Sequence, residues 1–218
     1  MKNNSGWQRS YAEAPEYLRD FSKAEDPDGR VVQELLAMTD WKRKRVLEIG
    51  CGSGRFSGSI AKESGAMQWL NLDRSRPLLG LAQLAGTSHL LQGDALSLPL
   101  AGNSVDVIFS AWVFSYFWGD QLSKVIQECS RVLSPGGEIW IFENEAMDIP
   151  DAMPEDGRMS ALKEEGFIKQ SHVLTELRFL SLGQAEAVTE FLMGSSAPKP
   201  DSRGRIPHQV QLLKKSFG

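Results

Sequence analysis

Cysteine and histidine are scarce in this chain of 218 residues, which contains two cysteines and three histidines. Two thiols cannot form a disulfide framework, and Cys51, Cys129 and the scattered histidines do not supply the ligand set of a structural zinc site. We therefore expect no bound metal and no fold that depends on disulfides.

Long apolar runs are also absent. No stretch is long enough to cross a bilayer, and residues 1–7 lack the hydrophobic segment of a secretion signal, so we expect a cytoplasmic protein with no membrane partner. The formal net charge of -4 argues against a dominant phosphate-binding surface, and nucleic acid is not expected as a partner. A basic run at 41–45 precedes the first predicted strand, at the edge opposite to the one where open α/β sheets bind ligands.

What the chain does contain is a glycine-rich loop directly after a short apolar run. Residues 46–56 read VLEIGCGSGRF, with Glu48 near the end of the run and glycines at 50, 52 and 54. Glycine permits backbone angles barred to other residues and leaves room for a ligand to rest on the main chain. The pattern predicts a strand that ends in a ligand-binding loop.

The spacing of that loop narrows the class of ligand. A dinucleotide loop reads G-x-G-x-x-G and holds a pyrophosphate at a helix N-terminus, whereas this loop reads G-x-G-x-G. A carboxylate at Glu48 would repel a pyrophosphate and attract an ammonium group, so we expect a cationic ligand head. The loop resembles motif I of the class I S-adenosylmethionine (SAM)-dependent methyltransferases, of the small-molecule, type 11-like kind.

Three further segments extend the resemblance over residues 44–145. A second predicted strand ends in Asp73, where a carboxylate can accept hydrogen bonds from both hydroxyls of a ribose. A third ends in Gly-Asp-Ala, and the resemblance assigns its Asp94 to the adenine amine. Residues 105–112 and 131–142 resemble the family's fourth strand, then its helix, Pro-Gly-Gly turn and fifth strand. Taken singly, Asp73 and Asp94 are also typical caps of helices and turns.

The resemblance implies that SAM is the cofactor and S-adenosylhomocysteine (SAH) the product. It also implies an α/β fold with a Rossmann-like, doubly wound sheet of seven strands, mostly parallel with an antiparallel last strand. The residues that it implies for cofactor binding are Glu48, Gly50, Cys51, Gly52, Gly54, Asp73, Arg74, Asp94, Ala95, Ser110 and Trp112.

Hydrophobic spacing is consistent with that fold, because predicted strands alternate with predicted helices. A capping box at Ser181 precedes the last helix, and residues 208–214 predict a closing strand. The other predicted helices cover residues 30–38, 55–64, 75–85, 120–133 and 158–165. We expect one domain over 1–218, made of a helical leader or lid at 1–40, the cofactor core at 44–145 and a substrate-side part at 146–218.

The leader carries Tyr11 and Tyr17. In related methyltransferases such a leader folds over the cofactor as a lid, which keeps water from the reaction. On that interpretation the two tyrosines contact the ligand. A helix packed on the outside of the sheet is an equally good interpretation.

Aromatic residues between positions 112 and 118 follow the fourth predicted strand, at the sheet edge where the methyl group should lie. SAM carries an activated methyl group, so the chain needs mainly to align a nucleophile and exclude water. We expect the acceptor to contact Tyr11, Tyr17, Trp112 and Tyr116. If the acceptor must lose a proton, the candidate bases are Glu143, Glu145 and Tyr116, with His172 and His208 unplaced.

The expected partner is a small organic acceptor with an aromatic or apolar body. An Asn-Pro-Pro-Tyr type motif is missing after the fourth strand, which disfavours methylation of base amines, and the several exposed thiols that arsenite transfer needs are missing too. Two alternatives stay open: a SAM-binding protein without transferase activity, and a methyltransferase that acts on RNA or protein. A nicotinamide oxidoreductase is disfavoured by the loop spacing.

Overall fold

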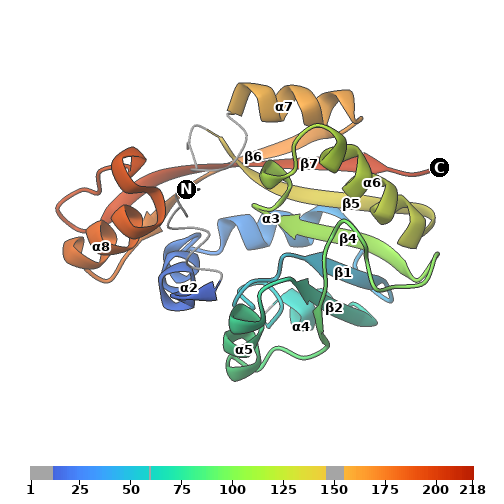
Figure 1. The fold of residues 1–218 in the computed structure, drawn as a ribbon, viewed down its shortest axis with the longest axis horizontal. Helices are drawn as coiled ribbons and strands as arrows, with labels where there is room; N and C mark the ends of the chain where they lie inside the picture. Colours follow the sequence, from blue (N-terminus) through green and yellow to red (C-terminus); the bar gives the residue numbers. More distant parts are fainter. Residues whose placement is uncertain (1–11, 59, 146–154) are drawn as a thin grey trace.

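A computed structural model describes residues 12–58, 60–145 and 155–218. Its centre is a seven-stranded sheet with the strand order β3-β2-β1-β4-β5-β7-β6, drawn in Figure 1. The strands are β1 (Arg45–Ile49), β2 (Gln68–Asp73), β3 (Leu90–Gln92), β4 (Val105–Ala111), β5 (Leu133–Glu145), β6 (Ile168–Arg178) and β7 (Arg205–Ser216).

Helices connect most of these strands. The α-helices are α2 (Pro15–Ala24), α3 (Arg30–Met38), α4 (Ile60–Glu63), α5 (Arg76–Leu84), α6 (Asp120–Val132), α7 (Glu155–Glu164) and α8 (Leu182–Met193). Two short 3-10 turns, η1 (Phe114–Tyr116) and η2 (Gly194–Ser196), follow β4 and α8. Among the described residues, none of the helices has the length and apolar character needed to span a bilayer.

The sheet confirms the predicted doubly wound α/β fold. β1 pairs in parallel with both β2 and β4, so the strand order reverses on either side of β1. β7 runs antiparallel to both of its neighbours, β5 and β6. Ligands of open α/β sheets bind beyond the carboxyl ends of the strands at such a reversal, and the glycine loop follows β1 at that place.

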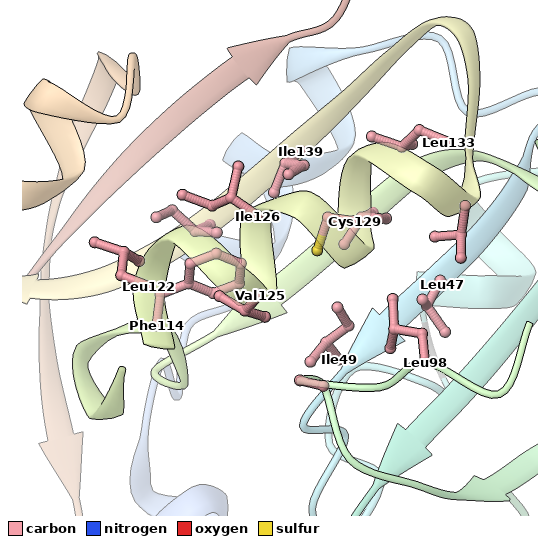
Figure 2. Packing of buried hydrophobic residues seen from close by; sticks show 14 of the residues in the cluster. Leu47, Ile49, Leu98, Phe114, Leu122, Val125, Ile126, Cys129, Leu133 and Ile139 are labelled. Atoms are coloured by element: carbon pink, nitrogen blue, oxygen red, sulfur yellow. The ribbon is translucent and has the colours of Figure 1, made fainter. Parts of the chain in front are cut away.

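The core lies in two layers, because successive residues of a strand point to opposite faces of the sheet. Ile108 of β4 packs in one layer with α6. Figure 2 shows Ile126 and Cys129 of this layer from close by. Val107 and Phe109 pack in the other layer with α3 and α4. Burial of this apolar surface is the main force that holds the helices on the sheet.

A third apolar cluster lies at one end of the molecule, where Figure 1 shows α2 and α8 next to each other. It joins Phe21 of α2 and Leu192 of α8 to Leu177 and Ile206 near the paired ends of β6 and β7. The leader is therefore tied to the last third of the chain.

Most of the predicted helices are confirmed. α3 and α6 match the predicted ranges closely, and Ser75 caps α5 by accepting a hydrogen bond from the backbone N–H of Leu78 at 3.4 Å. The capping box before α8 forms in modified shape: Ser181 accepts from Gln184 N, while the Gln184 side chain accepts from Leu180 N.

The predicted helix at 55–64 is wrong in extent. Its first part is a series of turns, and only Ile60–Glu63 is helical. Gly58 lowers the helix propensity within this range, although Phe56 and Ile60 face the core as expected. The Pro-Gly-Gly segment also differs, since it lies within the bounds of β5 as an irregular stretch between the Val105–Leu133 and Val107–Glu138 pairs.

Candidate functional site

A cavity of about 250 Å³ opens at the carboxyl ends of β1, β2 and β4. Its wall combines the glycine loop, the segments after β2, β3 and β4, and one side of helix α2. Four carboxylates and two guanidiniums line it, namely Glu25, Glu48, Asp73, Asp94, Arg55 and Arg74. The excess of acidic groups favours a cationic ligand.

The glycine loop forms the floor of the cavity. Gly50 has a φ of +76°, and a Cβ there would lie 2.2 Å from Cγ2 of Val113. Gly52 has a φ of +55°, and a Cβ there would meet no atom within 4 Å. Gly50 thus allows the loop to pack against the segment after β4, whereas Gly52 leaves its backbone bare at the cavity wall.

Asp73 fixes the position of that loop. One carboxylate oxygen accepts a hydrogen bond from Gly52 N at 2.8 Å, and the other accepts from Ser75 N at 2.8 Å. The side chain is buried, and this burial raises the pKa of Asp73. Each carboxylate oxygen has a second lone pair that can accept a further hydrogen bond from a ligand hydroxyl.

Glu48 lies at the cavity wall, but part of its carboxylate is already used by the fold. Oε2 accepts hydrogen bonds from Ser57 Oγ and from Trp69 Nε1, both at 2.9 Å. The residue is 2% exposed, and desolvation raises the pKa of Glu48 to about 7. Its contact with a ligand ammonium stays a prediction.

The segments after β2 and β3 complete this side of the cavity. Arg74, Asp94 and Ala95 line the wall, as the resemblance implies. Asp94 is exposed, and its Oδ1 accepts a hydrogen bond from Leu96 N at 2.9 Å within a turn. Asp94 therefore caps a turn with Oδ1, and its Oδ2 can still accept a hydrogen bond from a ligand.

Comparison with known proteins agrees with this geometry. A family model described as "Methyltransferase domain" matches residues 47–141. The malonyl-[acyl-carrier protein] O-methyltransferase of Methylococcus capsulatus is 39% identical over 99 residues, which cover 44% of this chain and 35% of that protein. Phosphoethanolamine N-methyltransferase 1 of Triticum aestivum is 33% identical over 129 residues, 56% of this chain and 26% of that protein.

Solved structures share the fold over most of the chain. A SAM-dependent methyltransferase from Thermotoga maritima superposes with a TM-score of 0.58 at 16% identity, covering 94% of this chain and 96% of that one. The chain is similar to a methyltransferase domain over residues 47–141 and has the fold of this solved methyltransferase. It spans only about a third or less of the length of the two curated relatives named above.

These similarities support SAM as the cofactor, and the cavity fits it. The bare backbone at Gly52 leaves open space where a side chain would intrude, and the acidic wall suits a ligand with a sulfonium and an ammonium group. Asp73 and Asp94 lie on the same cavity with that loop, so the three segments that the sequence singled out converge.

Two residues expected at the cofactor lie elsewhere. Ser110 is fully buried within β4, and its hydroxyl donates a hydrogen bond to the carbonyl of Ile49 at 2.8 Å. Gly54 does not line the cavity; a Cβ there would lie 2.3 Å from Oγ1 of Thr87, so this glycine allows close packing beyond the end of α5. Both residues therefore support the packing around the loop, outside the cavity wall.

Trp112 and Tyr116 line the cavity as well, and their contact with an acceptor stays a prediction. Trp112 has a φ of +58°, a strained conformation for a bulky residue, and its ring stacks with Phe56 and His208 at centroid distances of 5.9 Å and 6.1 Å. Tyr17 is not at the cavity, because it stacks with Phe191 of α8 at 4.0 Å. Tyr11 lies outside the described residues.

Of the two carboxylate candidates for a base, the structure describes the side chain of Glu143 only, and it places that side chain outside the cavity wall. Glu143 is 1% exposed, accepts a hydrogen bond from Ser115 N at 3.0 Å and lies 3.9 Å from Arg158 Nε. Burial raises the pKa of Glu143 to about 7, but the residue does not line the cavity. The backbone of Glu145 lies in β5, and its side chain is outside the described part.

The histidines are not bases at the cavity either. His208 is buried, and burial lowers its pKa to about 3. Its Nε2 lies 2.7 Å from Oδ1 of Asn144, which fits a neutral ring that donates to the amide oxygen. His172, on β6, is not part of the cavity wall. Among the candidates whose side chains the structure describes, Tyr116 alone lines the cavity.

Several lining residues escaped the sequence analysis. Arg55 directly follows the glycine loop, and its place in that motif could have pointed to it. Asn144 enters the wall from the end of β5 without a recognisable signal. Helix α2 contributes Leu18, Phe21 and Ser22, with Glu25 at its C-cap.

Proposed function

We propose that this chain binds SAM in the cavity and transfers its methyl group to a small organic acceptor. The observation that carries the proposal is that Gly52, Asp73 and Asp94 line the same cavity as Trp112 and Asn144. A cofactor on the first group and an acceptor on the second would share one space, as methyl transfer by in-line displacement requires.

When bound, SAM supplies a methyl group on a sulfonium beside a neutral leaving group. The chain's part is to bind, to orient and to exclude water. Asp73 would accept from the ribose hydroxyls, and Asp94 would accept from the adenine amine. On the acceptor side, the ring of Trp112 offers an apolar wall, and the Asn144 amide, held by His208, offers a polar contact.

The leader would act as the lid over this reaction. Phe21 and Leu18 of α2 lie on the cavity wall, and α2 packs on α8 through the third apolar cluster. An apolar cover of this kind keeps water away from the transferred group. The curated relative named for phosphoethanolamine gives a first small acceptor to test, and the relative named for malonyl-[acyl-carrier protein] gives a protein-borne acceptor for comparison.

Calorimetry followed by a turnover assay tests the proposal. The purified chain should bind SAH and SAM, and should not bind NADH. A panel of small acceptors is then screened for affinity in the presence of SAH and for SAH formation from SAM. Cofactor binding without turnover of any acceptor would support a regulatory SAM-binding protein instead. Affinity only for RNA or for a protein would overturn the small acceptor.

A further inference from the structure

An ion pair in the cavity wall connects helix α2 to the glycine loop. Nη1 of Arg55 lies 2.5 Å from Oε2 of Glu25, and the two side chains are only 16% and 6% exposed. Arg55 follows Gly54 directly, whereas Glu25 is the residue at the C-cap of α2. Both residues line the cavity, so the lid and the loop meet through opposite charges at the ligand site.

Besides the ion pair with Glu25, two aromatic rings contact the guanidinium of Arg55. Its Cζ lies 4.6 Å from the ring centre of Phe56 and 5.1 Å from that of Trp112. Arginine presents five N–H donors in a rigid fork, of which Glu25 uses only part. Aromatic rings on the guanidinium therefore fix its plane and leave donors for a second carboxylate.

Glu25 also has a carboxylate oxygen that can accept a hydrogen bond from a ligand. Its hydrogen bond to Arg55 uses Oε2, and within the described part of the chain Oε1 makes no hydrogen bond. Glu48, the other carboxylate expected to meet an ammonium group, already accepts hydrogen bonds from Ser57 and Trp69. A cation at this end of the cavity would find a ready acceptor in Glu25.

These contacts suit a ligand group that carries both charges at once. Resting on the proposed function, we propose that Glu25 and Arg55 receive the amino-acid end of the cofactor, with its carboxylate on Arg55 and its ammonium on Glu25. Charge-assisted hydrogen bonds of this kind are stronger than neutral ones, and the arginine fork matches a carboxylate. Because Glu25 belongs to the lid, occupancy of the cavity would hold α2 closed.

Two ligands isolate the amino-acid group in a binding experiment. SAH carries it, and 5′-methylthioadenosine is the same nucleoside thioether without it. Calorimetry on the full chain should give an affinity for SAH about tenfold to a hundredfold higher than that for methylthioadenosine. In the double variant Glu25→Gln with Arg55→Gln, this preference should fall to within about threefold, and the affinity for methylthioadenosine should stay within about threefold of wild type.

A second ion pair between the leader and the sheet offers a matched control. Arg178 lies 3.1 Å from Asp28, and neither residue lines the cavity. The double variant Asp28→Asn with Arg178→Gln should keep the full preference for SAH. Hydrogen exchange gives a further measurement: SAH should slow exchange in α2 of the wild type, and methylthioadenosine should not.

The possible results distinguish a failure of the amino-acid receptor from a failure of the proposed function. An unchanged preference in the Glu25/Arg55 double variant would overturn the amino-acid receptor while cofactor binding stands. Equal loss of both ligands would overturn it as well, because the pair would then support the whole cavity. If the wild-type chain bound neither ligand, the proposed function itself would fail, and the receptor with it.

Discussion

At Gly50 the chain needs both an unusual backbone angle and the absence of a side chain. Its φ is +76°, and a Cβ would lie 2.2 Å from Val113 Cγ2. We predict that Gly50→Ala lowers the free energy of unfolding by about 1–3 kcal/mol, because it adds both a clash and strain. Urea denaturation followed by circular dichroism measures the change.

Two companion variants separate clash from strain at Gly50. Adding Val113→Ala to Gly50→Ala removes the colliding methyl groups but leaves the positive φ, so part of the loss should be recovered. Gly58→Ala is the control, since a Cβ at Gly58 meets no atom within 4 Å. It should change the free energy of unfolding by less than about 0.5 kcal/mol. Wild-type stability in Gly50→Ala would contradict this account of the loop.

Glu48 gives the protein a characteristic dependence of stability on pH. Its pKa rises from 4.5 to about 7 on folding, because burial disfavours the charged form. The folded state therefore binds the proton more tightly, and stability present below about pH 4.5 is lost as the pH rises through about 7. We predict that Glu48→Gln, which keeps an acceptor oxygen for Trp69 or Ser57, flattens this decline.

Denaturation curves at about pH 5 and about pH 8 test the role of Glu48. The wild type should lose about 1–3 kcal/mol more than Glu48→Gln between these two conditions. Glu63→Gln is the control, because Glu63 is exposed on α4, and its pH profile should parallel that of the wild type. A parallel profile for Glu48→Gln would exclude Glu48 as the titrating group.

At the scale of elements, α2 is held mainly through α8. Tyr17 stacks on Phe191 with ring centroids 4.0 Å apart and planes 12° apart. We predict that Phe191→Ala speeds hydrogen exchange in residues 15–24 and lowers the free energy of unfolding by about 1–3 kcal/mol. Leu180→Ala is the control, since Leu180 is 93% exposed just before α8. Unchanged exchange in α2 would show that other contacts hold the leader.

Elements with a strong repeating pattern were predictable from the sequence. α6 shows apolar residues at helical spacing, and they form its buried face. The segment at 55–64 was not predictable in the same way. Its apolar residues Phe56 and Ile60 pack in the core as expected, but Phe56 lies in a series of turns and the helix begins only at Ile60. Apolar spacing reports which side chains are buried, and glycine content then decides the backbone conformation between them.

At the scale of the whole molecule, the part of the site formed by the ends of β1, β2 and β3 was predictable from the sequence. The part contributed by helix α2 and by the end of β5 was not. Gly52, Asp73 and Asp94 lie at successive strand ends, which the topology brings to one edge of the sheet. Glu25 and Asn144 reach the same cavity from segments without a motif, and tertiary packing alone brings them there. Tyr17 was expected to contact a ligand, but its ring packs α2 against Phe191 of α8.

Because the cavity wall draws on the leader and on several strand ends, a bound ligand should stabilise the chain as one unit. We predict that SAH at a hundred times its dissociation constant raises the free energy of unfolding by about 2.7 kcal/mol. Asp94→Ala should reduce this stabilisation at the same SAH concentration by weakening the adenine contact. Asp94 is exposed, so the variant should fold normally without ligand.

The variant Asp40→Ala is a control that distinguishes the loss of a ligand contact from the loss of a hydrogen bond within a turn. Asp40 is exposed and accepts a hydrogen bond from Lys42 N, two residues on, just as Asp94 accepts from Leu96 N, but it lies outside the cavity wall. Both variants lose the same local bond, yet only Asp94→Ala loses a ligand partner. Thermal unfolding across an SAH series should therefore shift Asp40→Ala in parallel with the wild type. An equal loss of SAH response in both variants would reduce Asp94 to a turn cap and remove it from the adenine site.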